Sequence, residues 1–322
     1  MKKIVSKYQD SDDALHPYDS PNYYEWWYLD AIFDNGYSCT LSCFWRTELE
    51  GQHVPMIIID LYPPEGERIR GSAAFDYKDC SASLEKCDVK WGDNYIVQDG
   101  DTYKVHLRTE NIGADLTYKR KVPGWKWTSN GLVKNDATGK QGWVNAIPRA
   151  EVTGTLLIDG KSLPVRGDGY HDKNWGDVDM SHSYAGWGWG RMYDAKYTFV
   201  YGWFMPLKAG DPIIPSLFAA RDSEIIFASP AIKFTMGKDE LHSESGLLLP
   251  TQIQIQAISE DIDINCRLDI VKILEYVTNV TGPGGSNTNY FRRLNTYNAR
   301  IKAGNSTDEV NGQALNEYVL LK

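Results

Sequence analysis

Short runs of alternating apolar and polar residues, separated by turn residues about every ten positions, restrict the fold of this 322-residue chain more than any other feature. Helical periodicity is scarce by comparison. Asn-Gly or Asp-Gly pairs at 35–36, 99–100 and 159–160 lie between such runs, and these pairs accept the positive φ angles of tight hairpin turns. The spacing predicts an all-β chain, a sandwich or barrel, with hairpins at these three positions.

The clearest alternation lies within residues 252–270. Ile253, Ile255 and Ala257 alternate with glutamines, and a second apolar stripe of the same period follows from 262 to 270. Because alternate residues of a strand point to opposite faces, this segment predicts a hairpin with one buried and one wet face. Residues 197–205 carry large apolar side chains on both faces, which predicts a strand whose aromatic residues fill a β core.

The length of the chain supports two domains or one large β domain. We place the boundary near residue 180, close to a glycine-rich segment. The expected organisation is an N-terminal extension at 1–19, followed by domains at 20–180 and 181–322.

The composition limits the partners of the chain. Acidic residues outnumber basic ones by 43 to 34, which argues against a nucleic-acid partner, because that affinity is built from Lys and Arg. The 11 Trp and 20 Tyr favour a protein that holds a hydrophobic small molecule. No apolar stretch approaches the roughly 20 residues of a membrane-spanning helix, although such a ligand is compatible with transient membrane contact. The oligomeric state stays open.

Two features favour a cytoplasmic location. The basic N-terminal residues are not followed by the apolar segment of a signal peptide. The five cysteines are odd in number and contain no CxxC pair, as expected in a reducing compartment. Cys80 and Cys87 form the one pair to check for a disulfide.

Residues 25–28, Glu-Trp-Trp-Tyr, fall on the first long strand that the pattern predicts. Alternation places Glu25 and Trp27 on one face and the other two side chains on the opposite face. One of these faces is a candidate lining for a ligand cavity. The alternative is a capping strand whose indoles plug the end of a barrel.

Residues 167–177 combine glycines with carboxylates, a phenol and an imidazole. In an extended run, Asp168, Tyr170 and Asp172 share one face, and His171 and Lys173 share the other. Like-charge proximity and burial both favour a protonated carboxyl, so either aspartate on that face is a candidate general acid. The alternative is a turn whose carboxylates accept backbone hydrogen bonds.

No motif in the chain indicates a metal or a cofactor. His171 and Asp172 are neighbours whose side chains point apart on a strand, and the other histidines lack ligand spacings such as HxH. The sequence also lacks a GxSxG elbow, a Walker loop and a GxGxxG segment followed by a helix. We therefore expect neither a catalytic metal nor a cofactor.

Residues 186–190 read Gly-Trp-Gly-Trp-Gly. Alternation places Trp187, Trp189 and Arg191 on one face and the three glycines on the other. Indole faces stabilise cations by about 2 kcal/mol or more when desolvated, and the glycine face permits close approach of a backbone or a ligand. The alternative is packing of this segment against a neighbouring strand.

Taken together, residues 25–28, residues 169–176 (Gly-Tyr-His-Asp-Lys-Asn-Trp-Gly) and residues 187–191 (Trp-Gly-Trp-Gly-Arg) resemble the motif set of the carotenoid hydratase (hydroxyneurosporene synthase)/AttH-like family. The order and spacing match over about residues 20–195. Three ordered motifs are specific for the family but not for one reaction. The family commonly has His where this chain has Lys173, a departure that leaves Asp172 in place.

The resemblance implies two lipocalin-like β-barrel domains packed side by side, with a hydrophobic pocket near their junction. It also implies several activities, because the family includes hydratases of isoprenoid double bonds, hydratases of prenylated phenolics and Diels–Alderases. In the hydratases, the aspartate of the Tyr-His-Asp motif is regarded as the proton donor and the tyrosine as its assistant. The matching residues here are Asp172 and Tyr170.

The residues and the resemblance together predict an acid-initiated hydration or cyclisation of a hydrophobic isoprenoid or polyene. Asp172 is the expected acid, and Trp143, Trp187 and Trp189 are expected to stabilise the cation. Glu25, Trp27 and Asp168 are further candidate contacts for the substrate. Two alternatives stay open: a pericyclase that acts by preorganising its substrate, and a non-catalytic carrier of a lipophilic molecule.

Overall fold

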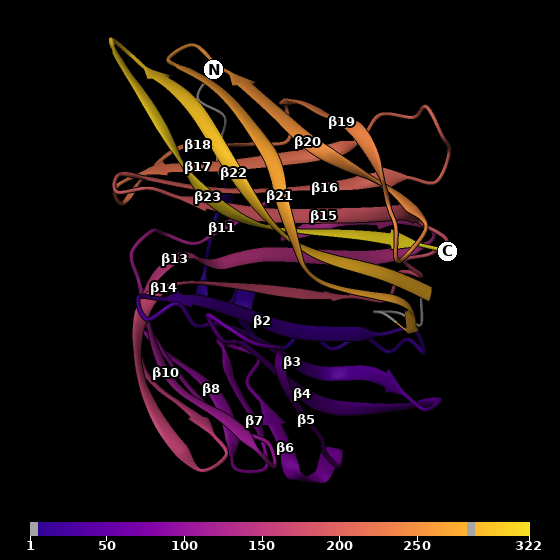
Figure 1. Cartoon of the computed structure of the whole chain (residues 1–322). Helices are drawn as coiled ribbons and strands as arrows, with labels where there is room; N and C mark the ends of the chain where they lie inside the picture. The colour runs from indigo at the N-terminus through magenta and orange to yellow at the C-terminus, as the bar shows by residue number, and fades with distance from the viewer. Residues whose placement is uncertain (1–5, 282–286) are drawn as a thin grey trace. The chain divides into compact units, whose positions relative to one another are not determined.

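The computed structural model describes residues 6–281 and 287–322 and folds them into two antiparallel β-sheets (Figure 1). Helix is confined in these ranges to two 3-10 turns, η1 (Asp10–Asp13) and η2 (Tyr77–Asp79). The predicted all-β class is therefore confirmed. The expected extension at 1–19 is described only from residue 6 onward.

Contacts divide the described chain into two compact units, Ser6–Val178 and Asp179–Lys322. The division falls two residues before the domain boundary expected from the sequence. The domain limits themselves stay predictions, because a division by contacts does not test whether each part folds alone.

The first unit holds fourteen strands. Eleven of them form a continuous path in the order β5-β4-β3-β2-β14-β13-β10-β9-β8-β7-β6. The short β11 and β12 pair with β13, and β1 pairs with β11. Their bounds are β1 (Ser6–Lys7), β2 (Tyr24–Phe33), β3 (Ser38–Leu49), β4 (Gln52–Tyr62), β5 (Ile69–Ala74), β6 (Cys80–Ala82), β7 (Asp88–Trp91), β8 (Asn94–Asp99), β9 (Thr102–Arg108), β10 (Ile112–Arg120), β11 (Trp125–Lys126), β12 (Leu132–Asp136), β13 (Gly139–Ile158) and β14 (Lys161–Gly176).

The second unit holds nine strands in the order β18-β17-β16-β15-β23-β22-β21-β20-β19. Their bounds are β15 (Tyr184–Tyr193), β16 (Tyr197–Pro206), β17 (Ile214–Arg221), β18 (Glu224–Ser229), β19 (Lys233–His242), β20 (Leu247–Ile258), β21 (Ile262–Thr281), β22 (Asn287–Ala303) and β23 (Ser306–Leu321).

The three predicted hairpins are present as β2–β3, β8–β9 and β13–β14. In the last of these, Ile158 pairs with Lys161, and both turn residues between them have positive φ angles, 48° at Asp159 and 75° at Gly160. That geometry is why an Asp-Gly pair occupies this turn. The predicted β20–β21 hairpin is also confirmed, with Ile253 and Ile255 buried on its dry face.

Each unit buries its own apolar core. In the first unit the largest fully buried side chains come from strands that are distant in sequence, and they include Trp27, Trp91, Tyr103, Tyr118 and Tyr170. In the second unit, β16 has eight consecutive buried residues, which confirms that both of its faces are covered. Its rings include Tyr197, Phe199, Tyr201 and Trp203.

The glycine face of β15 is packed by β16 instead of lining an open surface. A Cβ atom on Gly188 would lie 2.0 Å from the indole of Trp203, and one on Gly190 would lie 2.3 Å from the hydroxyl of Tyr201. The close approach expected at these glycines is therefore made by aromatic rings of the neighbouring strand.

We expect Gly188→Ala to lower the free energy of unfolding by about 1–3 kcal/mol, because a methyl group there forces the buried indole of Trp203 to move. Gly237→Ala is the matched control, since Gly237 is also in a strand and a Cβ there meets no atom within 4 Å. Urea unfolding of both variants measures the difference. Equal stability of the two variants would contradict this packing.

Candidate active site

Strand β14 presents different chemistry on its two faces. It lies between β2 and β13, with Asp172 opposite Tyr28 and Lys173 opposite Trp27. Because paired residues of antiparallel strands point to the same side, Asp172 shares a face with Tyr28, and Lys173 shares the other with Trp27.

Asp172 is held by three side chains of this sheet. Trp143 on β13 donates its indole N–H to Oδ2 at 2.9 Å, and Asn174 donates its amide to Oδ1 at 2.8 Å. The hydroxyl of Tyr170 lies 2.9 Å from Oδ2 and 2.6 Å from Oδ1 of Asn145. Asp172 is 6 % exposed, and Tyr170 and Asn145 are fully buried. The structure therefore brings together the expected acid, its expected assistant and one expected indole.

Two more indoles adjoin Trp143. Its ring centroid lies 5.9 Å from that of Trp125, edge to face, and 6.1 Å from that of Trp127. Trp125 is buried and Trp127 half-buried. The aromatic group that adjoins the acid in this unit is thus Trp125, Trp127 and Trp143.

The sequence analysis missed four members of this site. Asn174 follows Asp172 by two positions, so strand alternation alone could have found it. Asn145 lies on β13, Trp125 on β11 and Trp127 just after β11. Only the pairing of β11 and β13, in which Trp125 is opposite Asn145, brings them to the site.

The prediction that Asp168 converges on Asp172 is wrong. Four residues of extended strand separate their Cα atoms by about 13 Å. Both carboxylate oxygens of Asp168 instead accept hydrogen bonds from the guanidinium of Arg149, at 2.9 and 3.1 Å. Asp168 therefore belongs to an ion pair whose carboxylate side chain is 44 % exposed.

Glu25 and Trp27 lie apart from Asp172, and their expected role as substrate contacts stays a prediction. The strand register places both on the opposite face of the sheet, where each is fully buried. Trp27 donates its indole N–H to the carbonyl of Asp13 and lies against Trp91 in the core. Trp27 is therefore part of the apolar core of the first unit.

Glu25 forms a buried ion pair with Lys173. It also accepts the backbone N–H of His16 at 2.9 and 3.1 Å and the hydroxyl of Tyr23. Burial acts to raise the pKa of Glu25, but Lys173 and His16 outweigh it, so the pKa is lowered. The Lys173 ammonium lies 3.4 Å from the centre of the Trp27 ring and donates to the carbonyl of Ala14. These contacts tie the N-terminal segment to β14 from behind the candidate site.

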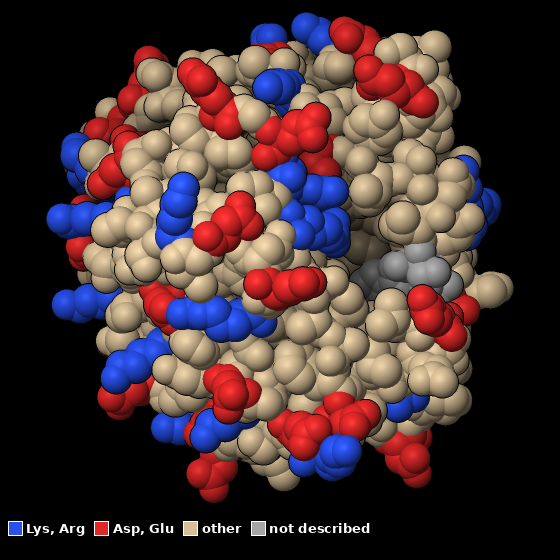
Figure 2. Space-filling model, turned by 60° about the horizontal axis from the view of Figure 1, so that its bottom comes forward, with Lys and Arg blue, Asp and Glu red and all other residues tan. Residues whose placement is uncertain are grey.

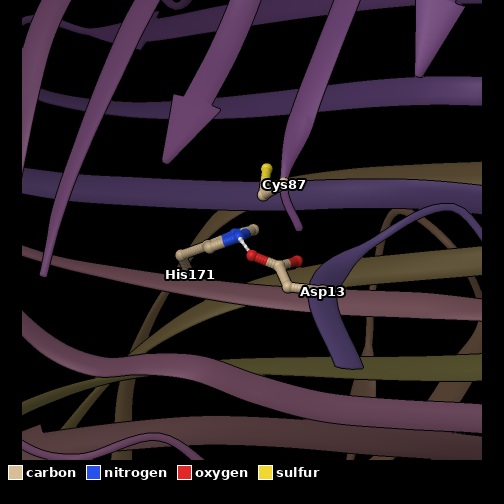
Figure 3. A group of neighbouring side chains, drawn as sticks. All are labelled: Asp13, Cys87 and His171. Carbon is tan, nitrogen blue, oxygen red and sulfur yellow. Dashed lines mark hydrogen bonds and ion pairs between the residues drawn. The ribbon is translucent and has the colours of Figure 1, made fainter. Parts of the chain in front are cut away.

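A second buried pair joins η1 to β14 (Figure 3). His171 Nδ1 lies 2.8 Å from the carbonyl oxygen of Tyr28, which only accepts, so Nδ1 carries a proton. Nε2 lies 2.9 Å from Oδ2 of Asp13, which also accepts the hydroxyl of Tyr103 at 3.0 Å. Burial acts to lower the pKa of His171, but the charge and hydrogen bond of Asp13 outweigh it and raise the pKa. The raised pKa therefore favours the imidazolium form of His171 beside Asp13.

Asp13, Cys87 and His171 have potential metal ligand atoms within 4.8 Å of one another, the one such group of three found in the described ranges. Their present state does not fit a bound metal. Nε2 of His171 is hydrogen-bonded to Oδ2 of Asp13, and burial raises the pKa of the Cys87 thiol well above its usual value, whereas a metal requires the thiolate. Cys80 and Cys87 form no disulfide.

The raised pKa of His171 predicts how this pair contributes to stability. The contribution is fully present below the unfolded pKa of 6.5 and is lost as pH rises through the higher folded value. We expect the stability difference between wild type and Asp13→Asn to shrink above about pH 6.5. Urea unfolding from about pH 6 to about pH 9 measures it, with the exposed His182→Gln as control. A pH-independent difference would contradict the assignment.

Trp187 and Trp189 lie on β15 in the second unit, on the face opposite the packed glycines. Trp189 is buried and Trp187 half-buried. Their role in binding a substrate stays a prediction.

With this geometry described, comparison with known proteins places the chain in a family. Residues 66–271, more than half of the chain, match the family model described as AttH-like. The chain belongs to the AttH-like family. The matched range includes β13 and β14, and with them Trp143, Tyr170 and Asp172.

Two curated relatives of this AttH-like chain are named for reactions on small molecules. It is 26 % identical over 228 residues to "Hydroxyneurosporene dehydrogenase" of Chlorobaculum tepidum, covering 58 % of each chain. It is 25 % identical over 221 residues to "Quinolone epoxide rearrangement protein asqO" of Emericella nidulans, covering 61 % of this chain and 58 % of the relative. Each match thus spans less than two thirds of the relative.

Solved structures share the fold of this family member over nearly its whole length. A Nitrosomonas europaea protein described as AttH has a TM-score of 0.67 at 16 % identity, covering 99 % of this chain and 98 % of its own. Kievitone hydratase of Nectria haematococca has a TM-score of 0.61 at 14 % identity, with 98 % and 97 % coverage. CghA with Sch210972 has a TM-score of 0.66 at 14 % identity, with 99 % and 97 % coverage. These likenesses confirm the predicted lipocalin-like fold.

The surface of this AttH-like protein carries charges of both signs. On the face shown in Figure 2, Lys and Arg are interspersed with Asp and Glu and form no continuous basic surface. That face lacks the basic stripe typical of nucleic-acid binding. In the ranges that the structure describes, no helix has the length and apolar character needed to cross a bilayer.

Proposed function

We propose that this protein is an enzyme that protonates a carbon–carbon double bond of a hydrophobic isoprenoid or polyene, using Asp172 as the acid. The cation is then captured by water, which is hydration, or by a group of the same molecule, which is cyclisation. The observation that carries the proposal is a nearly buried carboxyl bonded to Tyr170 and Trp143 beside two more indoles.

The proposed reaction is complete without a cofactor. The π electrons of the alkene form a C–H bond with the proton of Asp172, and the O–H electron pair remains on the carboxylate. In hydration, a water oxygen donates a lone pair to the cationic carbon and its excess proton returns to Asp172. In cyclisation, an internal hydroxyl or alkene forms the new bond and the same carboxylate accepts the proton released.

The surroundings of Asp172 suit both its neutral form before proton transfer and its carboxylate form afterwards. Little exposure to water favours the neutral acid and strengthens cation–π attraction to the indoles. After protonation, the indole N–H of Trp143 and the amide of Asn174 stabilise the new carboxylate by direct hydrogen bonds. The names of two relatives, a hydratase and an epoxide rearrangement protein, support hydration or rearrangement of a small molecule in general.

The test is to incubate the purified protein with a lipophilic extract of its source in water enriched in heavy oxygen, and to identify products by mass spectrometry. A product that gains one labelled water indicates hydration, and an unlabelled isomer of a consumed compound indicates cyclisation. A compound that co-purifies with the protein while nothing in the extract changes would overturn the proposal in favour of a carrier.

A further inference from the structure

Strand β22 of the second unit carries a charged residue on the face that forms the apolar core. Alternate residues of this strand, Phe291, Arg293, Asn295 and Tyr297, point to the same side, and all four are buried. Phe291 and Tyr297 belong to the core of the unit. Arg293, which is 1 % exposed, therefore places a positive charge inside that core.

Arg293 has no acidic partner in residues 6–281 and 287–322. Of its five N–H groups, two donate to the amide oxygen of Asn316 and one donates to the carbonyl of Pro250, and both acceptors are neutral. The adjacent Arg292, on the other face of β22, does have a carboxylate partner in Glu317. The remaining residues, 1–5 and 282–286, contain no Asp or Glu.

The surroundings of Arg293 do not balance its charge. Burial lowers its pKa to about 10, and only the phenols of Tyr201 and Tyr318 act in the opposite direction. Burial raises the pKa of both phenols, so neither is a phenolate at neutral pH. The guanidinium lies 4.7 Å from the centre of the Tyr318 ring, but a ring face attracts a cation without neutralising it. Buried charges in proteins are normally paired, so this one lacks a counter-ion.

Two polar side chains beside Arg293 have atoms without a hydrogen-bond partner in the described chain. They are both amide atoms of Asn295 and the hydroxyl of Tyr201, and both residues are fully buried. Tyr201 pairs with Gly190, which has no side chain, so the phenol extends across β15 toward β23. On β23, Asn316 pairs with both Gly190 and Arg293. Arg293, Asn295 and Asn316 all act to lower the pKa of Tyr201, as expected of its neighbours.

We propose that the interior of the second unit binds a carboxylate, held by the guanidinium of Arg293, with the Asn295 amide and the Tyr201 hydroxyl as further donors. Two of the five N–H groups of Arg293 have no acceptor in the described chain, and the planar fork of a guanidinium matches the two oxygens of a carboxylate. The carboxylate belongs to a small free acid or to a larger apolar acid. The inference goes beyond the proposed function, because Asp172 and Tyr170 lie in the first unit.

Isothermal titration calorimetry of the whole protein with sodium acetate and with sodium octanoate, in a buffer low in chloride, tests this site. We expect one-to-one binding of a carboxylate to wild type, weakened about tenfold or more in Arg293→Met. Arg300→Met is the matched control, since Arg300 lies on the same strand but is exposed, and it should bind as wild type does.

The choice of probes separates the two sources of the carboxylate. Equal affinity for the two acids identifies the carboxylate group alone as the ligand, and tighter binding of octanoate identifies an apolar acid. Octan-1-ol has the same chain without the charge. Binding of octan-1-ol as tight as that of octanoate would overturn the inference, and so would the absence of binding by either acid.

A second variant keeps the test decisive if Arg293→Met does not fold. Asn295→Asp places a carboxylate two residues from Arg293 on the same face of β22, so the chain itself supplies the counter-ion. We expect this variant to bind either acid about tenfold more weakly than wild type and to unfold at a higher urea concentration when no acid is added. Unchanged binding, or a stability below that of wild type, would contradict an uncompensated charge at Arg293.

Discussion

Replacing Asp172 with Asn is expected to lower kcat by about 10²- to 10⁴-fold while ligand binding is retained. The amide is nearly isosteric with the carboxyl and can still accept the hydrogen bond of Trp143 at 2.9 Å. It cannot transfer a proton to an alkene carbon. The measurement is steady-state turnover of the substrate found in the extract, with Kd determined separately by equilibrium binding.

The matched control for this prediction is Asp168→Asn. It makes the same chemical change on the same strand, but at a partly exposed carboxylate that is bonded to Arg149. We expect its kcat to stay close to that of wild type. Full activity of Asp172→Asn would contradict the general-acid assignment and would favour a pericyclase that acts by preorganisation.

Removing one partner of the buried Glu25–Lys173 pair is expected to destabilise the first unit strongly. Lys173→Met leaves a carboxylate in a site with no exposure to water, and breaking such a pair costs about 3–5 kcal/mol. The backbone N–H of His16 and the hydroxyl of Tyr23 continue to bond Glu25 but carry no charge, and the ring of His16 lies 3.5 Å from its carboxylate. Urea unfolding followed by the fluorescence of the buried tryptophans measures the loss.

The double variant Glu25→Leu/Lys173→Met tests the reason for this loss. It removes both charges and replaces them with apolar groups, so we expect it to be more stable than Lys173→Met alone. A double variant that is as unstable as the single one would show that packing, and not an uncompensated charge, causes the effect.

Local pattern was sufficient to predict the strands and hairpins of this chain. The alternation at 252–257 predicts which face of β20 is buried, and the Asp-Gly pair predicts the turn after β13. Both predictions succeed because side-chain alternation and turn geometry depend on only a few neighbouring residues. The family motifs further implied the lipocalin-like fold that the structural likenesses confirm.

The candidate site was predictable only in part. Tyr170 and Asp172 are two positions apart on one strand, so alternation alone places them together. Whether the Asp168 carboxylate lies near Asp172 depends on the distance between them along the strand and on the hydrogen bonds that Arg149 of the neighbouring strand donates to Asp168. Likewise, only the pairing of Trp27 with Lys173 shows that Trp27 belongs to the opposite face. Cross-strand register is set by the whole sheet and cannot be read from one segment.

The most direct test of acid initiation is to run the reaction in deuterium oxide and locate deuterium in the product. Exchange places deuterium on Asp172, so each product molecule should carry one solvent-derived deuterium bonded to carbon, whether water or an internal group captures the cation. The deuterium label thereby distinguishes proton transfer to carbon from a pericyclic rearrangement, which requires no proton from the protein or the solvent. A product formed without any carbon-bound deuterium would contradict the account.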